Sequence, residues 1–333
     1  MKKQWRICGL GNYSDYYSYF LFGIAQGSFL NNAWFRAVPL FGRTLQQVQA
    51  EILWFKPHLV LCHMIFNKQP HNQDEVFAVL KRIRAHGIKV AYHAGDARTE
   101  PRYPGKISTL VDFALCNHNL IEKYSKIWNV PCYYWPYQCL DQNYIVDPVD
   151  QFKCQVAFAG SLSDNQHHAP RAKFIGKLKE HLKIKTFPTA DSGNTRFQTA
   201  ELSSSANAVL GFQMGLDVKG YIDVRPFQYI GAGALYFHDR HPTVERFFRE
   251  GVHYVAFERD NADDFVKKYD YYVNQHPEKG RKIREQGFRY CQRYHSSKQR
   301  IASVISLLEG KGYYIYVLND KNEVEKVVNP WAK

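Results

Sequence analysis

The sequence predicts an α/β fold with two domains, each built on a parallel sheet. Two observations support this prediction. Short apolar runs alternate with amphipathic segments, which is the pattern of strand–helix units stacked into a parallel sheet. The alternation stops in the polar, proline-containing stretch Leu140–Phe152, which we interpret as a linker, and then starts again. The chain length of 333 residues fits two domains of ordinary size.

The composition is that of a basic globular protein. Hydrophobic residues make up 45% and aromatic residues 15%, which is enough for large cores. The net charge of +13, from 44 Lys and Arg against 31 Asp and Glu, indicates a nucleotide, nucleic acid or membrane surface as partner, or simply a solvated basic face. The seven cysteines are scattered without a Cys-x-x-Cys pair, and no apolar signal region follows the N-terminus, so we expect a cytoplasmic protein. No apolar run is long enough to span a membrane.

The first half contains five expected strands and three expected helices. The strands are Trp5–Cys8, His58–Ile65, Lys89–Tyr92, Val111–Cys116 and Pro131–Trp135. The helices are Asp15–Gln26, one that follows Thr44 and runs to Phe55, and Asp74–His86. Thr44 and Gln47 form a capping box, and Gly87 ends the third helix. Gly9-Leu-Gly11 lacks the third glycine of a dinucleotide loop, so we expect a tight turn there.

Polar residues follow several of these strands, at the edge where an open α/β sheet binds its ligands. They are Asn12, Tyr13, Ser14 and Asp15, then His63 and Asn67, then His93 to Arg98, and finally Asn117 and His118. Most are expected to cap helices or turns. A histidine in such a place is more often a hydrogen-bonded part of the scaffold than a catalyst.

The second half repeats the pattern and ends in helices and a hairpin. The expected strands are the run from Gln155 to the turn at Gly160 and Ser161, then Lys183–Phe187, Ala208–Phe212 and Ala234–Phe237. The expected helices are Arg171–Leu182, Asp263–Val273, Lys279–Arg293 and Ser297–Leu308. Tyr313–Leu318 and Glu323–Val328 flank a polar turn and predict a β-hairpin.

The stretch from Asp223 to Phe237 reads as a short helix followed by a buried strand. Asp223 is expected to cap the helix, Pro226 suits its first turn, and Gly231 ends it. Arg225 is therefore expected at a helix entrance, where free N–H groups and the helix dipole favour an anion. A guanidinium adds bidentate hydrogen bonds to phosphate oxygens, so the pattern predicts a diphosphate site. A capped helix with a surface arginine is the alternative.

These residues resemble the GT-B glycosyltransferases, and among them the spore-maturation (CgeB-like) proteins and the phage DNA base β-glucosyltransferases. The shared element is Arg-x-(aromatic)-Glu before a small-residue turn and an apolar strand, present here as Arg225-Pro226-Phe227-Gln228 with Gly231 following. The resemblance implies that Arg225 holds the donor diphosphate and that Gln228 takes the ribose hydroxyls. Gln228 replaces the family's glutamate and lacks the charge that strengthens such hydrogen bonds.

The resemblance also implies roles for residues elsewhere in the chain. Gly160 and Ser161 are expected against the donor phosphates, with Arg171, or alternatively Lys173, reaching them from the next helix. Asp96 matches the catalytic base of the phage enzymes, in a strand-then-Asp-x-Arg segment in which Arg98 keeps the carboxylate ionised. Asp15 or His93 is the substitute base. The acceptor side is expected to include Asn12, Tyr13, His63 and Arg98.

The sequence thus predicts a GT-B fold of two Rossmann-like domains facing across a cleft. Residues 1–145 form the acceptor domain, 146–300 the nucleotide-sugar domain, and 301–333 a returning helix and a β-hairpin. The expected reaction is metal-independent transfer, inverting if Asp96 is the base, from a nucleotide-sugar such as a UDP-sugar to a hydroxyl of a glycan. The nucleotide-sugar is a co-substrate and no other cofactor is expected. Hydroxymethylated DNA bases are the alternative acceptor, and a non-catalytic binding protein or an epimerase is the alternative function.

Overall fold

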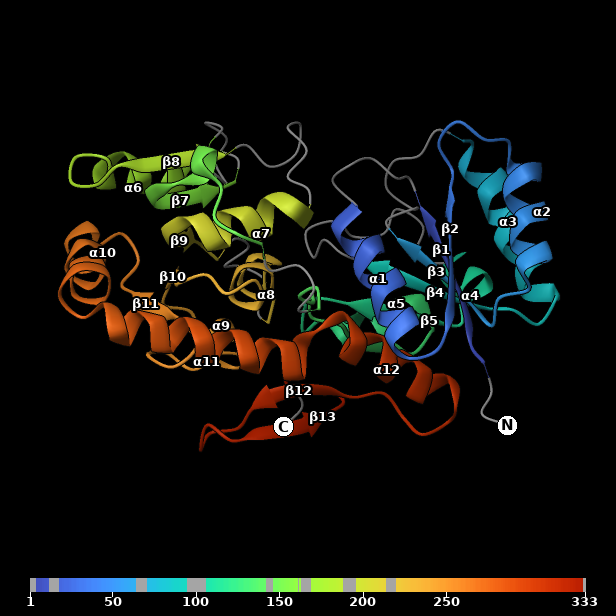
Figure 1. Cartoon of the computed structure of the whole chain (residues 1–333). Helices are drawn as coiled ribbons and strands as arrows, with labels where there is room; N and C mark the ends of the chain where they lie inside the picture. Colours follow the sequence, from blue (N-terminus) through green and yellow to red (C-terminus); the bar gives the residue numbers. More distant parts are fainter. Residues whose placement is uncertain are drawn as a thin grey trace.

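The structure is a computed structural model that describes residues 4–11, 18–63, 71–94, 106–141, 146–160, 162, 169–187, 196–213 and 220–331. Within these residues two parallel sheets lie side by side, and two consecutive helices run beneath both of them (Figure 1). The strands of the first sheet fall within residues 6–134 and those of the second within 154–257. The fold class that the sequence predicts is confirmed. The predicted domain boundaries stay predictions.

The first sheet has six strands among the described residues, in the order β2-β1-β3-β4-β5-β6, and all its pairings are parallel. The strands are β1 (Arg6–Gly11), β2 (Trp34–Pro39), β3 (Leu59–His63), β4 (Lys89–Ala94), β5 (Phe113–Cys116) and β6 (Cys132–Tyr134). The helices are α1 (Ser18–Leu30), α2 (Leu45–Phe55), α3 (Gln73–Ala85), α4 (Ile107–Leu110) and α5 (Ile121–Trp128). The strand order reverses between β1 and β3, which makes the carboxyl ends of these two strands the switch point where such sheets bind ligands.

Three local predictions for this half were incomplete or wrong. Strand β2 was not predicted, because it is an edge strand whose Trp34, Arg36 and Ala37 are exposed and which therefore lacks apolar alternation. Helix α5 was also not predicted. Gly9 and Gly11 lie inside β1 rather than in a turn. A Cβ on Gly9 would lie 3.0 Å from side-chain atoms of α1 and β2, so the glycine serves close packing.

The second sheet has five strands among the described residues, in the order β11-β10-β9-β7-β8, again all parallel. The strands are β7 (Cys154–Ala159), β8 (Ile184–Phe187), β9 (Ala206–Gly211), β10 (Tyr236–Asp239) and β11 (Val255–Phe257). The helices are α6 (Ala169–Leu178), α7 (Arg196–Ser205), α8 (Arg225–Gly231), α9 (Pro242–Glu245), α10 (Ala262–Tyr269), α11 (Pro277–His295) and α12 (Ser297–Leu308). A 3₁₀ turn, η4 (Asp150–Phe152), precedes the sheet, and a π-helical segment, η5 (Asp270–Gln275), follows α10. The order of this sheet reverses between β7 and β9.

The joint between α11 and α12 ties the two halves together. Backbone hydrogen bonds link Cys139 N to the His295 carbonyl at 3.0 Å and Ser297 N to the Cys139 carbonyl at 2.9 Å. The guanidinium of Arg300 is buried and donates to the carbonyls of Pro136 at 3.0 Å and Tyr137 at 3.2 Å. Because buried charges persist only when hydrogen-bonded, these contacts hold α12 against the segment that follows the first sheet. The helix then packs along α1.

The C-terminal hairpin is present as predicted, with β12 (Ile315–Leu318) paired antiparallel to β13 (Val324–Val327). The Asn319 side chain accepts hydrogen bonds from the backbone of Lys321 and Glu323, both at 2.9 Å, and this fixes the turn. Arg246 donates to the Leu318 carbonyl at 2.7 Å, which pins the hairpin to the loop after α9. The hairpin therefore lies beneath the second half of the molecule (Figure 1).

Candidate functional site

The carboxyl end of β7 lies at the switch point of the second sheet and is covered by a side chain from α8. The Nε atom of Arg225 donates a hydrogen bond to the Ala159 carbonyl at 2.9 Å. A Cβ built on Gly160 would lie 3.2 Å from Nη2 of Arg225 and 2.5 Å from the Phe158 ring. Glycine therefore lets the guanidinium approach the strand end closely. The structure brings together Gly160 and Arg225, two residues expected at the donor diphosphate.

Arg171 lies close enough to Arg225 for the two charges to interact. It stands in the first turn of α6, is only 4% exposed, and its guanidinium lies 5.1 Å from the centroid of the Phe158 ring. Burial, followed by the charge of Arg225, lowers the pKa of Arg171 to about 10, against the opposing effect of Asp223. Arg171 is thus still charged at neutral pH. Lys173, the alternative, is exposed.

Among the described residues at this place, two arginines stand against one carboxylate, Asp223, and all three side chains have little solvent access. Bringing two guanidinium groups together costs free energy unless an anion lies beside them. A diphosphate carries the required charge and accepts forked hydrogen bonds from arginine. The geometry therefore suits binding of a nucleoside diphosphate group.

The entrance of α8 is less open to an anion than the sequence predicts. The N-cap is Val224, one residue after the expected Asp223, and its side chain makes no cap hydrogen bond. Asp223 instead accepts a hydrogen bond from Arg225 N at 3.2 Å and forms an ion pair with the Arg225 guanidinium. Pro226 has no N–H to offer. The positive charge of the site thus comes from arginine side chains and not from the short helix.

The rest of the Arg225 element divides between core and surface. Phe227 is fully buried, with its ring 5.6 Å from that of Phe247, so it packs in the core and presents no surface to a ligand. Gly231 is buried where a Cβ would overlap the Cβ of Cys139, so its role is close packing between the two halves. Gln228 is half-buried on the same helix. Of these three, only Gln228 keeps access to a ligand.

His63 and His93 form a buried pair at the carboxyl ends of β3 and β4. Their Nδ1 atoms are 2.7 Å apart, and their rings stack with centroids separated by 4.9 Å. Burial lowers the pKa of His63 to about 3, and burial, followed by the repulsion that the neighbouring His63 would add, holds the pKa of His93 well below its ordinary value. Both rings are therefore neutral. A weakly basic, fully buried ring is a poor general base, so the geometry speaks against His93 in that role.

Six expected site residues lie outside the described part of the chain. They are Asn12, Tyr13, Asp15, Asp96, Arg98 and Ser161. The strands that lead to them are described: β1 ends at Gly11, and β4 ends at Ala94, two residues before Asp96. The roles of these six residues stay predictions.

A buried cluster at the ends of β9 and β10 was not predicted. The Asp239 carboxylate accepts hydrogen bonds from Gln213 N at 2.8 Å and from Arg259 Nε at 2.6 Å. Burial raises the pKa of Asp239, but His238, Arg259 and the Gln213 hydrogen bond outweigh it, so the pKa lies below its ordinary value. The cluster links the carboxyl ends of β9 and β10. The sequence signal for it is the polar pair His238-Asp239 at the end of an otherwise apolar strand.

Metal-ligating clusters and membrane-spanning helices are both lacking in the residues that the structure describes. No group of three or more His, Cys, Asp or Glu side chains there could hold a metal ion. None of the helices described is both long and apolar enough to cross a bilayer. All seven cysteines are described and are free thiols, five of them buried.

Comparisons with known proteins show which family and which folds the chain is similar to. Residues 158–306, which contain Gly160, Arg171 and Arg225, match the family described as glycosyl transferase-like. No curated protein sequence matches the chain. The structure of Anabaena HepE in complex with UDP and glucose is similar, with a TM-score of 0.56 and 11% identity over 91% of this chain and 100% of that one.

Two further structures have a similar TM-score and identity. T4 phage BGT in complex with its UDP-glucose substrate gives a TM-score of 0.56 and 11% identity over 91% of this chain and 99% of that one. A DNA-modifying β-glucosyltransferase gives a TM-score of 0.57 and 12% identity over 91% of this chain and 99% of that one. At these identities the likeness shows the fold alone. The resemblance to spore-maturation proteins stays a prediction.

Proposed function

We propose that this chain, which has the GT-B fold and a glycosyltransferase-like second half, transfers a sugar from a nucleotide-sugar to a hydroxyl acceptor. The observation that carries the proposal is the placement of Arg171 and Arg225 at the end of β7, within the region that matches the family. UDP is the proposed nucleotide, because the similar structures are those of HepE in complex with UDP and glucose and of T4 phage BGT in complex with UDP-glucose. The transferred group is a hexosyl or pentosyl residue.

The two arginines would act on the leaving group. Negative charge develops on the nucleoside diphosphate as its bond to the sugar breaks, and preorganised cations stabilise that charge in the transition state. Arg171 and Arg225 are already held in place by Phe158, Asp223 and the Ala159 carbonyl, so little reorganisation is needed. The half-buried Gln228 would accept a ribose hydroxyl through its carbonyl.

Activation of the acceptor falls to Asp96 in this proposal. Asp96 follows β4, so it comes from the carboxyl edge of the first sheet, and its carboxylate would take the proton of the attacking hydroxyl. Attack from the face opposite the nucleotide inverts the sugar. Asp15 is the substitute base, and Arg98 supports ionisation of Asp96.

The acceptor belongs to the first half of the molecule and the donor to the second. We place the acceptor in residues 1–145, near Asn12, Tyr13 and His63, and the donor in 146–300, with 301–333 tying the halves together. A hydroxyl of a glycan is the proposed acceptor. The switch point between β1 and β3 supports this placement, because open parallel sheets bind ligands there.

The test begins with purified protein and labelled UDP-, GDP- and TDP-glucose without acceptor. A transferase slowly hydrolyses its preferred donor, whereas an epimerase isomerises the sugar and a non-catalytic protein only binds it. Either of the last two results would end the transferase proposal.

The donor site is tested by removing Arg225 without leaving a buried charge behind. Arg225→Gln alone removes the ion-pair partner of the buried Asp223. The double variant Asp223→Asn/Arg225→Gln is therefore the better comparison. Loss of a charge-assisted phosphate contact should weaken UDP binding about ten- to a hundred-fold in calorimetry. A folded double variant with parental UDP affinity would remove Arg225 from the site.

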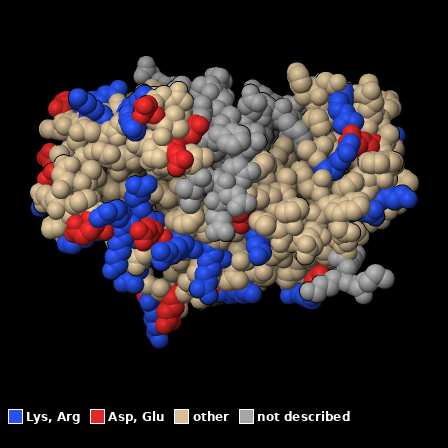
Figure 2. All heavy atoms as spheres, viewed as in Figure 1, with Lys and Arg blue, Asp and Glu red and all other residues tan. Residues whose placement is uncertain are grey.

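DNA is the alternative acceptor, favoured by the net charge of +13 and by the fold likeness to a DNA-modifying enzyme. Figure 2 shows Lys and Arg side chains gathered on the lower side of the molecule, where α11 and the hairpin lie, with acidic side chains among them. Binding to duplex DNA containing hydroxymethylcytosine should then fall steeply with salt, because phosphate contacts release counterions. Weak binding with a flat salt response would leave the glycan as acceptor.

A further inference from the structure

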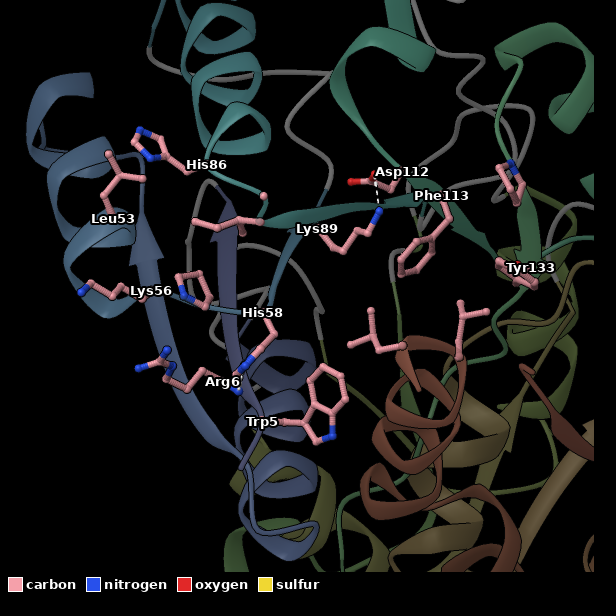
Figure 3. A pocket seen from close by; sticks show the side chains of 16 residues that line it. Trp5, Arg6, Leu53, Lys56, His58, His86, Lys89, Asp112, Phe113 and Tyr133 are labelled. Atoms are coloured by element: carbon pink, nitrogen blue, oxygen red, sulfur yellow. Dashed lines mark hydrogen bonds and ion pairs between the residues drawn. The ribbon is translucent and has the colours of Figure 1, made fainter. Parts of the chain in front are cut away.

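A pocket of about 910 Å³ lies at the amino edge of the first sheet (Figure 3). Its walls include the first residues of three strands, Arg6 of β1, Lys89 of β4 and Phe113 of β5, together with Leu307 and Leu308 at the end of α12. The five residues of β3 separate this edge from the carboxyl edge by roughly 13 Å. The pocket is therefore distinct from the proposed transfer site.

One part of the pocket wall is apolar and partly open to solvent. Trp5 and Phe113 are each 6% exposed and form its buried surface. Four apolar side chains that line it are only half-buried: Leu53, Tyr133, Leu307 and Leu308. The volume lies within the range of sites that bind small molecules, about 300–1,000 Å³. An apolar ligand body placed here would remove these half-buried surfaces from water.

The other part of the wall is cationic. Figure 3 draws Arg6 and Lys56 at one end of the pocket and the Lys89–Asp112 ion pair further along. Lys56 is exposed at the same end. Two cationic side chains, Arg6 and Lys56, thus line this end of the pocket, and their charge favours an anionic group there.

The acidic residues nearby are already neutralised. Asp112 pairs with Lys89 at 3.2 Å and with Arg84 at 3.3 Å. Burial raises the pKa of Asp112, but the Val90 hydrogen bond and the two cations outweigh it, so the carboxylate is charged and committed to them. Glu309, which accepts a hydrogen bond from Trp5, pairs with Lys311 at 2.7 Å. The pocket therefore keeps an excess of positive charge.

Helix dipoles explain only part of this pattern. Lys56 follows α2 and His86 follows α3, and cations at helix C-termini offset the partial negative charge of the last carbonyls. Arg6 lies on a strand, so this explanation does not extend to it. The dipole effect is also weaker than a charge-assisted hydrogen bond to an anionic headgroup.

We propose that this pocket binds an amphipathic organic anion, an acyl or aryl group that carries one carboxylate, sulfonate or phosphate. The apolar body lies against Trp5, Phe113 and the end of α12, and the headgroup lies between Arg6 and Lys56. Such a ligand contacts both the first sheet and α12, the helix that returns from the second half. Binding therefore stabilises the junction of the two halves, and does so independently of the nucleotide-sugar.

The test uses the full chain and the fluorescent probe 1-anilinonaphthalene-8-sulfonate, with the neutral N-phenyl-1-naphthylamine as its uncharged match. We expect saturable binding of the sulfonate, displacement by laurate but not by dodecanol, and no displacement by UDP. Laurate should also raise the unfolding temperature of the parental protein. Displacement of the sulfonate by UDP would place the probe in the donor site and overturn the proposal.

Variants separate the charged end from non-specific hydrophobic binding. Arg6→Gln and Lys56→Gln should each weaken probe and laurate binding by about tenfold, and Leu308→Glu should abolish it. Lys81→Gln, on the exposed face of α3, is the matched control and should bind as the parent does. Parental affinity of the Arg6→Gln/Lys56→Gln double variant, or equal competition by dodecanol and laurate, would refute an anion site. UDP binding in these variants should be unchanged, which keeps this test separate from that of the donor site.

Discussion

Replacing Arg171 by methionine should separate the stability of the protein from its affinity for the donor. Methionine keeps the length and apolar volume that pack against Phe158 but removes the charge. The pKa of Arg171 lies at about 10 because the site is buried and Arg225 is near, so the fold disfavours the charged form. We therefore expect Arg171→Met to be no less stable than the parent.

The size of the effect follows from that pKa. A fall from the ordinary value of 12.5 to about 10 corresponds to about 3 kcal/mol of unfavourable free energy in the folded state. This cost is fully present below about pH 10, where the guanidinium is charged in both folded and unfolded chains, and it is relieved as the pH rises through about 10. The loss of the cation–π contact with Phe158 offsets part of the gain. The expected increase in the free energy of unfolding at pH 7 thus lies between zero and about 3 kcal/mol.

Donor affinity should move in the opposite direction. Loss of one charge-assisted contact to phosphate should weaken UDP binding about ten- to a hundred-fold. Urea denaturation at pH 7 measures the stability and calorimetry measures UDP affinity. Arg289→Met is the matched control, because Arg289 is exposed on α11, and it should change neither quantity. An Arg171→Met protein that unfolds more easily than the parent, or that binds UDP with parental affinity, would refute the reasoning.

Two further predictions concern the base and the joint between the halves. Asp96→Asn should leave UDP affinity unchanged and reduce sugar transfer about 10²- to 10⁴-fold, as measured by product formation under saturating donor; transfer at the parental rate would remove Asp96 from the mechanism. Gly231→Ala should lower the free energy of unfolding by roughly 1–3 kcal/mol, because the added methyl group overlaps the buried Cys139 side chain. Gly176→Ala in α6 is its control, since a Cβ there meets no other atom within 4 Å, and it should be neutral or slightly stabilising in the same urea titration.

Local pattern determined most of the secondary structure. The capping box of Thr44 and Gln47 is present with both hydrogen bonds, α12 has the predicted bounds of Ser297 and Leu308, and the hairpin turn forms at Asn319. These features depend on residues close together in the chain, so the sequence contains all the information that they need. β2 was not predicted because an exposed edge strand lacks apolar alternation, which is the signal that marks a strand in sequence.

The donor site divides in the same way. The sequence by itself determined that Gly160, Arg171 and Arg225 are candidates, because each occupies a recognisable turn or helix start. Only the tertiary structure decided that they meet at the end of β7 and that Phe227 and Gly231 serve packing. It also decided that Asp223 pairs with Arg225, so that the start of α8 is less available to an anion than expected. Burial, ion pairing and the distance between residues far apart in the chain are properties of the packed fold. For that reason the pocket at the amino edge, which joins Arg6 to Leu308, carries no signal in the sequence.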